Sequence, residues 1–90
     1  MRSNFNPTKE IETIPINTIK NDIKSHIGKN ITIYEINKNT KKFTNTYTGT
    51  ILNVYNNFFD ISMIINNSRI EKSFNYSGFS VGLLRYDIID

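Results

Sequence analysis

The chain has 90 residues, of which 38% are hydrophobic and 12% aromatic, and its formal net charge is +3 at pH 7. This length is that of one small domain with a modest core. Cysteine is absent and His26 is the single histidine, which excludes a disulfide framework, a thiolate nucleophile and a metal site built from several histidines. Because neither a run of about 18 apolar residues nor a secretory signal pattern occurs, we expect a cytoplasmic protein without membrane contact.

A short helix is predicted after a polar N-terminal tail of residues 1–15. Asn17 or Thr18 can cap this helix through a side-chain oxygen, and Gly28 can end it by taking a positive φ. Its apolar face is a stripe of isoleucines spaced four residues apart, Ile19, Ile23 and Ile27. A helix of about ten residues is too short to be stable alone, so the stripe must pack against the remainder of a single domain, residues 16–90.

Five short strands are predicted after the helix. They cover residues 31–36, 43–54, 58–65, 70–76 and 81–89. Asn66 and Asn67 fit a tight hairpin turn, because asparagine tolerates positive φ. Gly49 indicates a bend or a bulge inside the long second strand. Residues 77–80 are expected to form a turn, or one turn of 3₁₀ helix.

One helix followed by five strands predicts a mainly β fold, namely a small five-stranded antiparallel barrel with the helix over one open end. A flat sheet of this size would leave two edges and one apolar face exposed, and curling the sheet removes both problems. The alternative is an open antiparallel meander with the helix on one face.

Several short motifs follow one another along residues 18–89. They are Ile23-Lys24, Ile27-Gly28-Lys29, Ile31-Thr32-Ile33, Lys41-Lys42, Thr48-Gly49-Thr50-Ile51-Leu52, Tyr55 with Phe59 and Ile61, and Ser73-Phe74-Asn75-Tyr76-Ser77 with Val81. In this order and spacing, the motifs resemble the Veg family of small bacterial proteins. Compared with that family, the segment before the second strand carries fewer basic residues.

The resemblance implies an SH3-like or Sm-like barrel, no known catalytic site, and a role in regulating transcription and biofilm formation. The family occurs mostly in low-GC Gram-positive bacteria. The composition fits such a genome, because 16 Ile, 14 Asn and 8 Lys have A/T-rich codons and alanine is absent.

His26 is the single candidate for a general base, and Asp22 lies one helical turn before it. The favoured alternative is a solvated helix pair, or a cation near the helix C-terminus. The sequence contains no phosphate-binding glycine loop, nucleophile elbow or metal-ligand spacing. We therefore expect no catalytic residue, no metal and no cofactor, and a protein that is not an enzyme.

Residues 20–42 hold six lysines and two acidic residues, a net charge of +4. The candidate face for nucleic acid or another partner comprises Lys29, Lys38, Lys41 and Lys42. Lysines can neutralise phosphates, and Tyr34, Phe43 or Tyr47 could offer stacking faces to single-stranded RNA or DNA. The alternative is a solvated basic face that keeps a strand edge soluble.

Phe58, Tyr76 and Phe79 are candidate anchors for a protein partner, since exposed aromatic side chains often anchor interfaces. The alternative is that these rings belong to the core. A homodimer would hide the edge strand and apolar patch that a small barrel leaves. We expect regulation through protein–protein interaction, for example with a transcription regulator, and direct nucleic-acid binding is the alternative.

Overall fold

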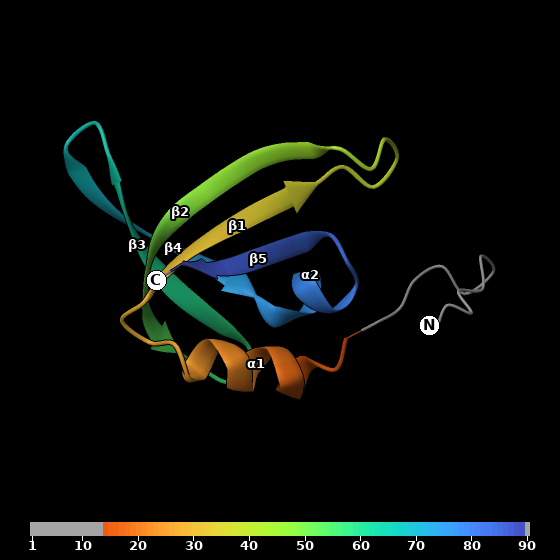
Figure 1. The fold of residues 1–90 in the computed structure, drawn as a ribbon, viewed down its shortest axis with the longest axis horizontal. Helices are drawn as coiled ribbons and strands as arrows, with labels where there is room; N and C mark the ends of the chain where they lie inside the picture. Colours follow the sequence, from red (N-terminus) through yellow and green to blue (C-terminus); the bar gives the residue numbers. More distant parts are fainter. Residues whose placement is uncertain (1–13, 90) are drawn as a thin grey trace.

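The computed structural model describes residues 14–89, and most of the predicted tail, residues 1–13, lies outside this range. The described chain forms two helices and five strands (Figure 1). They are α1 (Ile16–Lys24), β1 (Asn30–Ile36), β2 (Phe43–Val54), β3 (Phe58–Ile65), β4 (Ser68–Asn75), α2 (Tyr76–Ser80) and β5 (Leu84–Ile89). The prediction of a mainly β fold with five antiparallel strands after a short helix is confirmed.

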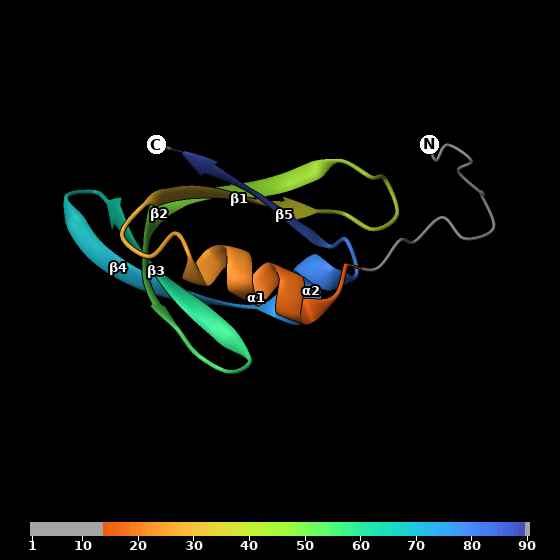
Figure 2. The same ribbon diagram turned by 60° about the horizontal axis from the view of Figure 1, so that its bottom comes forward.

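The strands form one antiparallel sheet in the order β4-β3-β2-β1-β5. The long strand β2 belongs to both halves of this sheet, because its first part pairs with β1 and its last part, from Thr50 to Val54, pairs with β3. A bulge between Ile51 and Asn53 lies in the second part, and a bulge bends a strand. Figure 2 shows β1 and β5 on one side and β3 and β4 on the other. The sheet is therefore curled into a small barrel that remains open between its two end strands, β4 and β5.

Gly49 allows β3 to lie tightly against β2. A Cβ atom at this position would lie 2.3 Å from the carbonyl oxygen of Ser62 on β3, so any other residue would force the backbone apart. The predicted bulge occurs further along the strand, and the role of Gly49 is this close approach of two backbones.

The core lies between the two halves of the sheet and the helices. α1 contributes Ile19 and Ile23, and α2 contributes Tyr76 and Phe79. The strands contribute Ile31, Ile33, Ile51, Phe59, Ile61, Met63 and Phe74. The Phe59 ring is central to this packing, since its centroid lies 5.8 Å from those of both Tyr76 and Phe79.

The start of α1 differs from the prediction. The helix begins at Ile16, and Asn17 and Thr18 lie inside it, so neither is the cap residue. The carbonyl oxygen of Pro15 accepts hydrogen bonds from the backbone N–H groups of Thr18 and Ile19 instead.

The end of α1 also differs, because the buried stripe contains two of the three predicted isoleucines, Ile19 and Ile23, and not Ile27. The helix ends at Lys24, and Ile27 is 49% exposed. Backbone hydrogen bonds to β2 draw the chain away from the helix axis: the Gly28 N–H donates to the Ile51 carbonyl, and the Ile51 N–H donates to the Lys29 carbonyl. Gly28 has the positive φ that was predicted, 91°.

The last third of the chain contains one confirmed turn and two shifted strands. The fourth strand, predicted at residues 70–76, is β4 at Ser68–Asn75. Asn66 and Asn67 have φ values of 52° and 66° and join β3 to β4, as predicted. The turn expected at residues 77–80 is the short helix α2, and β5 begins at Leu84 rather than at Val81.

Candidate functional site

A groove of about 920 Å³ lies between α1, the turn that joins β1 to β2, and the segment that enters β5. We call it the β5 groove. Its apolar lining includes Ile14, Ile36, Phe43, Val81, Leu84 and Tyr86. Ile14 lies beside Val81 in this lining although the two residues are far apart in the sequence. Two hydrogen bonds to Ser80 hold Ile14 there: the Ile14 N–H donates to the Ser80 carbonyl, and the Ser80 hydroxyl donates to the Ile14 carbonyl.

The rim of the β5 groove exposes apolar side chains to solvent. Phe43 is 58% exposed, Ile14 47% and Val81 46%. Single exposed apolar residues are ordinary, but several around one groove are typical of an interaction site.

The charged groups of the β5 groove are Asp22, Lys41 and Arg85. The Tyr86 hydroxyl donates a hydrogen bond to the Asp22 carboxylate, which joins α1 to β5. Burial, and then this contact with Asp22, raise the pKa of Tyr86 well above its ordinary value. Because a hydrogen bond from a neutral hydroxyl does not neutralise a carboxylate, one acidic and two basic side chains line the groove, and Lys41 and Arg85 leave it with a net positive charge.

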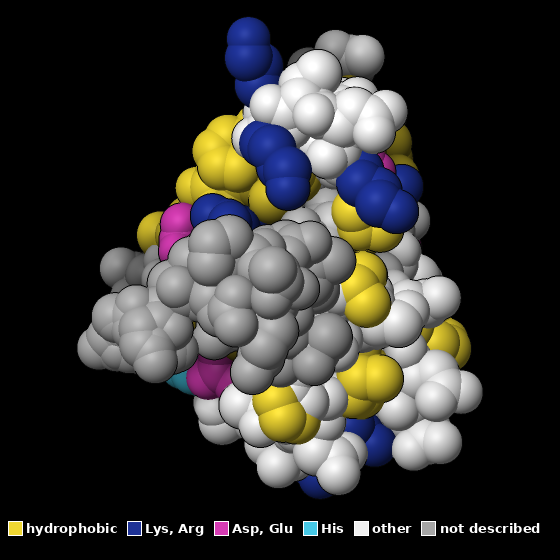
Figure 3. Space-filling view, turned by 90° about the vertical axis from the view of Figure 1, so that its right-hand side faces the viewer, with side chains coloured by type: hydrophobic (Ala, Val, Ile, Leu, Met, Phe, Trp, Pro, Cys, Tyr) yellow, Lys and Arg dark blue, Asp and Glu magenta, His cyan; other side chains and the backbone are white. Residues whose placement is uncertain are grey.

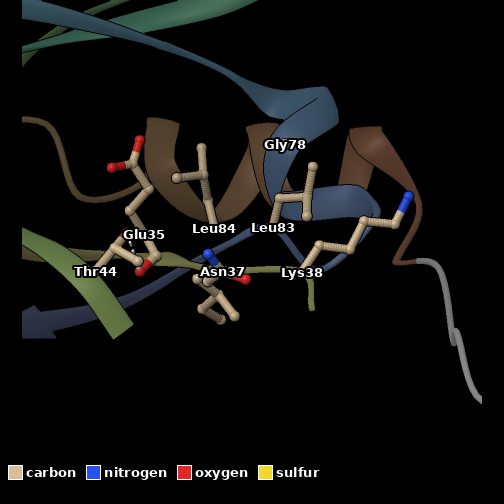
Figure 4. Close-up of a pocket in the computed structure, with 8 residues that line it drawn as sticks. Glu35, Asn37, Lys38, Thr44, Gly78, Leu83 and Leu84 are labelled. Carbon is tan, nitrogen blue, oxygen red and sulfur yellow. Dashed lines mark hydrogen bonds between the residues drawn. The ribbon is translucent and has the colours of Figure 1, made fainter. Parts of the chain in front are cut away.

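A smaller hollow of about 520 Å³ lies at the base of the same turn and is drawn in Figure 4. Two of its polar side chains, Glu35 and Asn37, are already bonded within the protein. Glu35 accepts a hydrogen bond from the Asn45 amide at 2.7 Å, and the Asn37 side-chain oxygen accepts the backbone N–H groups of Asn39 and Thr40. Leu84 fills the space beside Gly78. The hollow therefore offers fewer groups to a ligand than the β5 groove does.

The four lysines of the predicted basic face do not lie together. Lys38, Lys41 and Lys42 belong to the turn between β1 and β2, whereas Lys29 precedes β1 at its other end. Seven strand residues separate them, a distance of about 20 Å. Arg85 joins the turn lysines instead, because the pairing of β1 with β5 places it opposite Tyr34. Figure 3 shows Lys and Arg side chains among hydrophobic ones on this side of the molecule.

Two of the predicted stacking aromatics form a pair near the lysines. The rings of Tyr34 and Phe43 are stacked with centroids 5.0 Å apart. Tyr47 lies elsewhere: its ring packs against Phe74, and the ammonium group of Lys72 lies over it at 5.1 Å.

Two of the three candidate interface aromatics belong to the core. Tyr76 is 1% and Phe79 is 3% exposed. For these two rings the alternative of core packing therefore holds, and neither is available to a partner. The Tyr76 hydroxyl donates to the carbonyl oxygens of Tyr55 and Phe58, at 3.0 and 3.1 Å. Phe58 is half-buried and stacks on the exposed ring of Tyr55.

His26 and Asp22 make the helix contact that their spacing predicts. The His26 Nδ1 atom lies 3.5 Å from the Asp22 carboxylate and 2.7 Å from the Asp22 carbonyl oxygen. Among residues 14–89, no three His, Cys, Asp or Glu side chains lie close enough to hold a metal ion. Neither helix in that part of the chain has the length and apolar character needed to cross a membrane.

The curled five-stranded sheet, with a helix before the first strand, defines a small β-barrel protein, and one of its grooves combines apolar lining with a basic rim. The family model described as biofilm formation stimulator VEG matches residues 14–79, from the start of the described chain into α2. The chain therefore belongs to the Veg family, and the resemblance drawn from its motifs is confirmed. Comparison with individual curated proteins gave no match. The family description supports a regulatory, biofilm-related role and does not describe an enzyme.

Proposed function

We propose that this Veg-family chain regulates without catalysis, by binding an acidic segment of a protein partner in the β5 groove. The observation that carries the proposal is the combination of exposed apolar side chains with two basic ones around a single groove. A transcription regulator is the class of partner that the family resemblance suggests.

The apolar character of the groove favours a protein over a nucleic acid as its ligand. Ile14 and Val81 are aliphatic and nearly half exposed. Aliphatic side chains stabilise a complex by packing against apolar side chains of a protein partner. Nucleic-acid affinity comes mainly from phosphate contacts and stacking.

The charges of the groove favour an acidic partner. Lys41 lies on the turn after β1, and Arg85 lies on β5, the strand that pairs with β1. Two cations on a rim attract carboxylates and set the orientation of a bound segment. Lys41 also holds a φ of 64°, a left-handed conformation that costs an ordinary residue about 1 kcal/mol, and such strain is concentrated at functional sites.

A synthetic peptide that alternates leucine with aspartate tests the proposal. In amide chemical-shift mapping, we expect it to shift Lys41, Phe43, Val81 and Arg85, and a peptide with lysine in place of aspartate to bind at least about tenfold more weakly. The double variant Lys41→Glu/Arg85→Glu should reverse this preference, and Lys29→Glu, at the far end of β1, should keep it. Equal binding of the two peptides to the unchanged protein would contradict the proposal.

One observation favours direct nucleic-acid binding as a second candidate, since Phe43 stacks on Tyr34 close to Lys38, Lys41 and Lys42. Single-stranded RNA would then bind at low salt and dissociate steeply as salt is added. Changing the three lysines to glutamate should abolish that binding without unfolding the barrel. No binding at low salt would eliminate this candidate.

A further inference from the structure

The hairpin of β3 and β4 ends in exposed isoleucines. Ile64 is 69%, Ile65 45% and Ile70 41% exposed. Figure 1 shows this hairpin projecting from the body, at the end opposite to the turn between β1 and β2. β4 is also an end strand of the sheet. An exposed strand edge beside exposed apolar side chains is a surface onto which another strand readily adds.

The register of the hairpin shows which face of β4 each side chain occupies. Ile70 pairs with the buried Met63, so Ile70 lies on the inner face of the sheet, while Arg69 and Glu71 lie on the outer face. The two-residue turn closes on the pair Ile65 and Ser68, which is the hydrogen-bonded pair of such a turn. Counting from this pair, the backbone N–H and C=O groups of Arg69 and Glu71 point to the open edge.

We propose that β4 pairs antiparallel with β4 of a second copy of this chain, on a two-fold axis that passes beside Ile70. A two-fold axis perpendicular to a sheet keeps each side chain on its own face, so it pairs only residues whose numbers differ by an even number. With the axis at Ile70, Arg69 lies opposite Glu71 of the second copy, and Glu71 lies opposite Arg69 of that copy.

Charge favours this register over the neighbouring ones. An axis at residue 69, 71 or 72 places Arg69, Glu71 or Lys72 opposite its own copy, and like charges directly opposite are unfavourable. Arg69 already lies 3.7 Å from Glu71 within one strand, so the four charged groups of the dimer alternate in sign. Shifting the register loses both cross-strand pairs.

The pairing would also cover the apolar surface. The two copies of Ile70 meet on the inner face, where Ile65 lies on the neighbouring strand of each copy. The two Arg69–Glu71 pairs exchange backbone hydrogen bonds, and the two sheets become one continuous sheet. The β5 groove lies at the opposite end of the molecule, so a dimer would present two grooves, and this inference stands independently of what the groove binds.

Analytical ultracentrifugation of charge-reversed variants tests the register. The unchanged protein should sediment as a dimer at high micromolar concentration. Arg69→Glu gives two acidic residues in each strand and Glu71→Arg gives two basic ones, so each variant alone should associate at least about tenfold more weakly. An equimolar mixture of the two variants, and the double variant Arg69→Glu/Glu71→Arg, should regain association, which also shows that the chains are folded. Lys24→Glu, an exposed charge reversal on α1, should sediment as the unchanged protein does.

A cysteine placed on the axis gives a second, covalent readout. The chain contains no cysteine, and residues opposite each other in a non-hydrogen-bonded pair have Cα atoms about 4.5 Å apart, within the range of a disulfide. Ile70→Cys should therefore cross-link on mild oxidation, much faster than Ile64→Cys, which is more exposed but off the axis. The proposal would be overturned if the unchanged protein were monomeric or if the single variants still dimerised. It would also be overturned if the mixture or the double variant remained monomeric, or if both cysteine positions cross-linked equally.

Discussion

The hydroxyl group of Tyr86 links the helix to the last strand, and its ionisation gives stability a dependence on pH. Burial and the nearby Asp22 raise its pKa above the ordinary value of 10.0. At pH values above about 10, the unfolded chain loses this proton while the folded chain keeps it. The folded state then binds more protons than the unfolded state, so the free energy of unfolding falls as the pH rises.

Tyr86→Phe tests this linkage. The variant loses the hydrogen bond to Asp22, so we expect it to be less stable than the unchanged protein by about 1 kcal/mol near neutral pH. That difference should shrink above about pH 10, because the variant has no proton to lose at this position. Urea unfolding of both proteins at a series of pH values measures it, and a difference that stays constant would contradict the explanation.

Lys41 is expected to lower the stability of the fold while it contributes to peptide binding. Its φ of 64° suits glycine, which carries no Cβ to clash in the left-handed region. Lys41→Gly should therefore raise the free energy of unfolding by about 1 kcal/mol and weaken the binding of the aspartate-containing peptide. Lys42→Gly is the matched control, since Lys42 is not among the residues with positive φ, and it should lower stability. A less stable Lys41→Gly protein would show that strain at this residue is absent.

At the scale of elements, α1 depends on two isoleucines rather than three. Ile23 is fully buried, whereas Ile27 is 49% exposed. Ile23→Ala should lower the free energy of unfolding by about 3 kcal/mol, and Ile27→Ala by less than about 1 kcal/mol. Denaturant unfolding compares the two variants, and equal losses would show that the stripe extends beyond the end of the helix.

The elements that the sequence predicts well are those set by local preferences. Alternation of apolar residues locates the strands, and Asn66 and Asn67 adopt the positive φ that their side chains tolerate. The end of α1 was predicted poorly because hydrogen bonds from Gly28 to distant Ile51 decide it. Propensity within the helix contains no information about such a contact.

The candidate site was predicted less well than the fold, for the same reason. Lys41 and Phe43 were recognised from charge and aromatic character along one stretch of sequence. Arg85 was missed because only the pairing of β1 with β5 brings it to the turn. Ile14 carries no motif, and Val81 was noted only for the family resemblance, so their exposure around one groove is visible only in three dimensions.

For the whole molecule, association through β4 makes thermal stability depend on protein concentration. Ligands that bind only the folded state stabilise it, and a second copy of the chain is such a ligand. We expect the melting temperature to rise by about 3 °C for each tenfold increase in concentration. Calorimetry of Arg69→Glu, which should show no such rise, is the control, and a constant melting temperature of the unchanged protein would argue against the dimer.

The pairing of β1 with both β2 and β5 sets an order in time for folding. A six-residue turn joins β1 to β2, whereas Asn30 pairs with Ile89 near the far end of the chain. Closing the longer loop costs more chain entropy, so β5 should dock after the other strands. Ile88→Ala should then speed unfolding and leave the folding rate nearly unchanged, while Ile51→Val should slow folding; stopped-flow kinetics distinguishes the two. Because β5 supplies Leu84, Arg85 and Tyr86, the groove is completed only in the final step of folding, and a partially folded chain has no site for a partner.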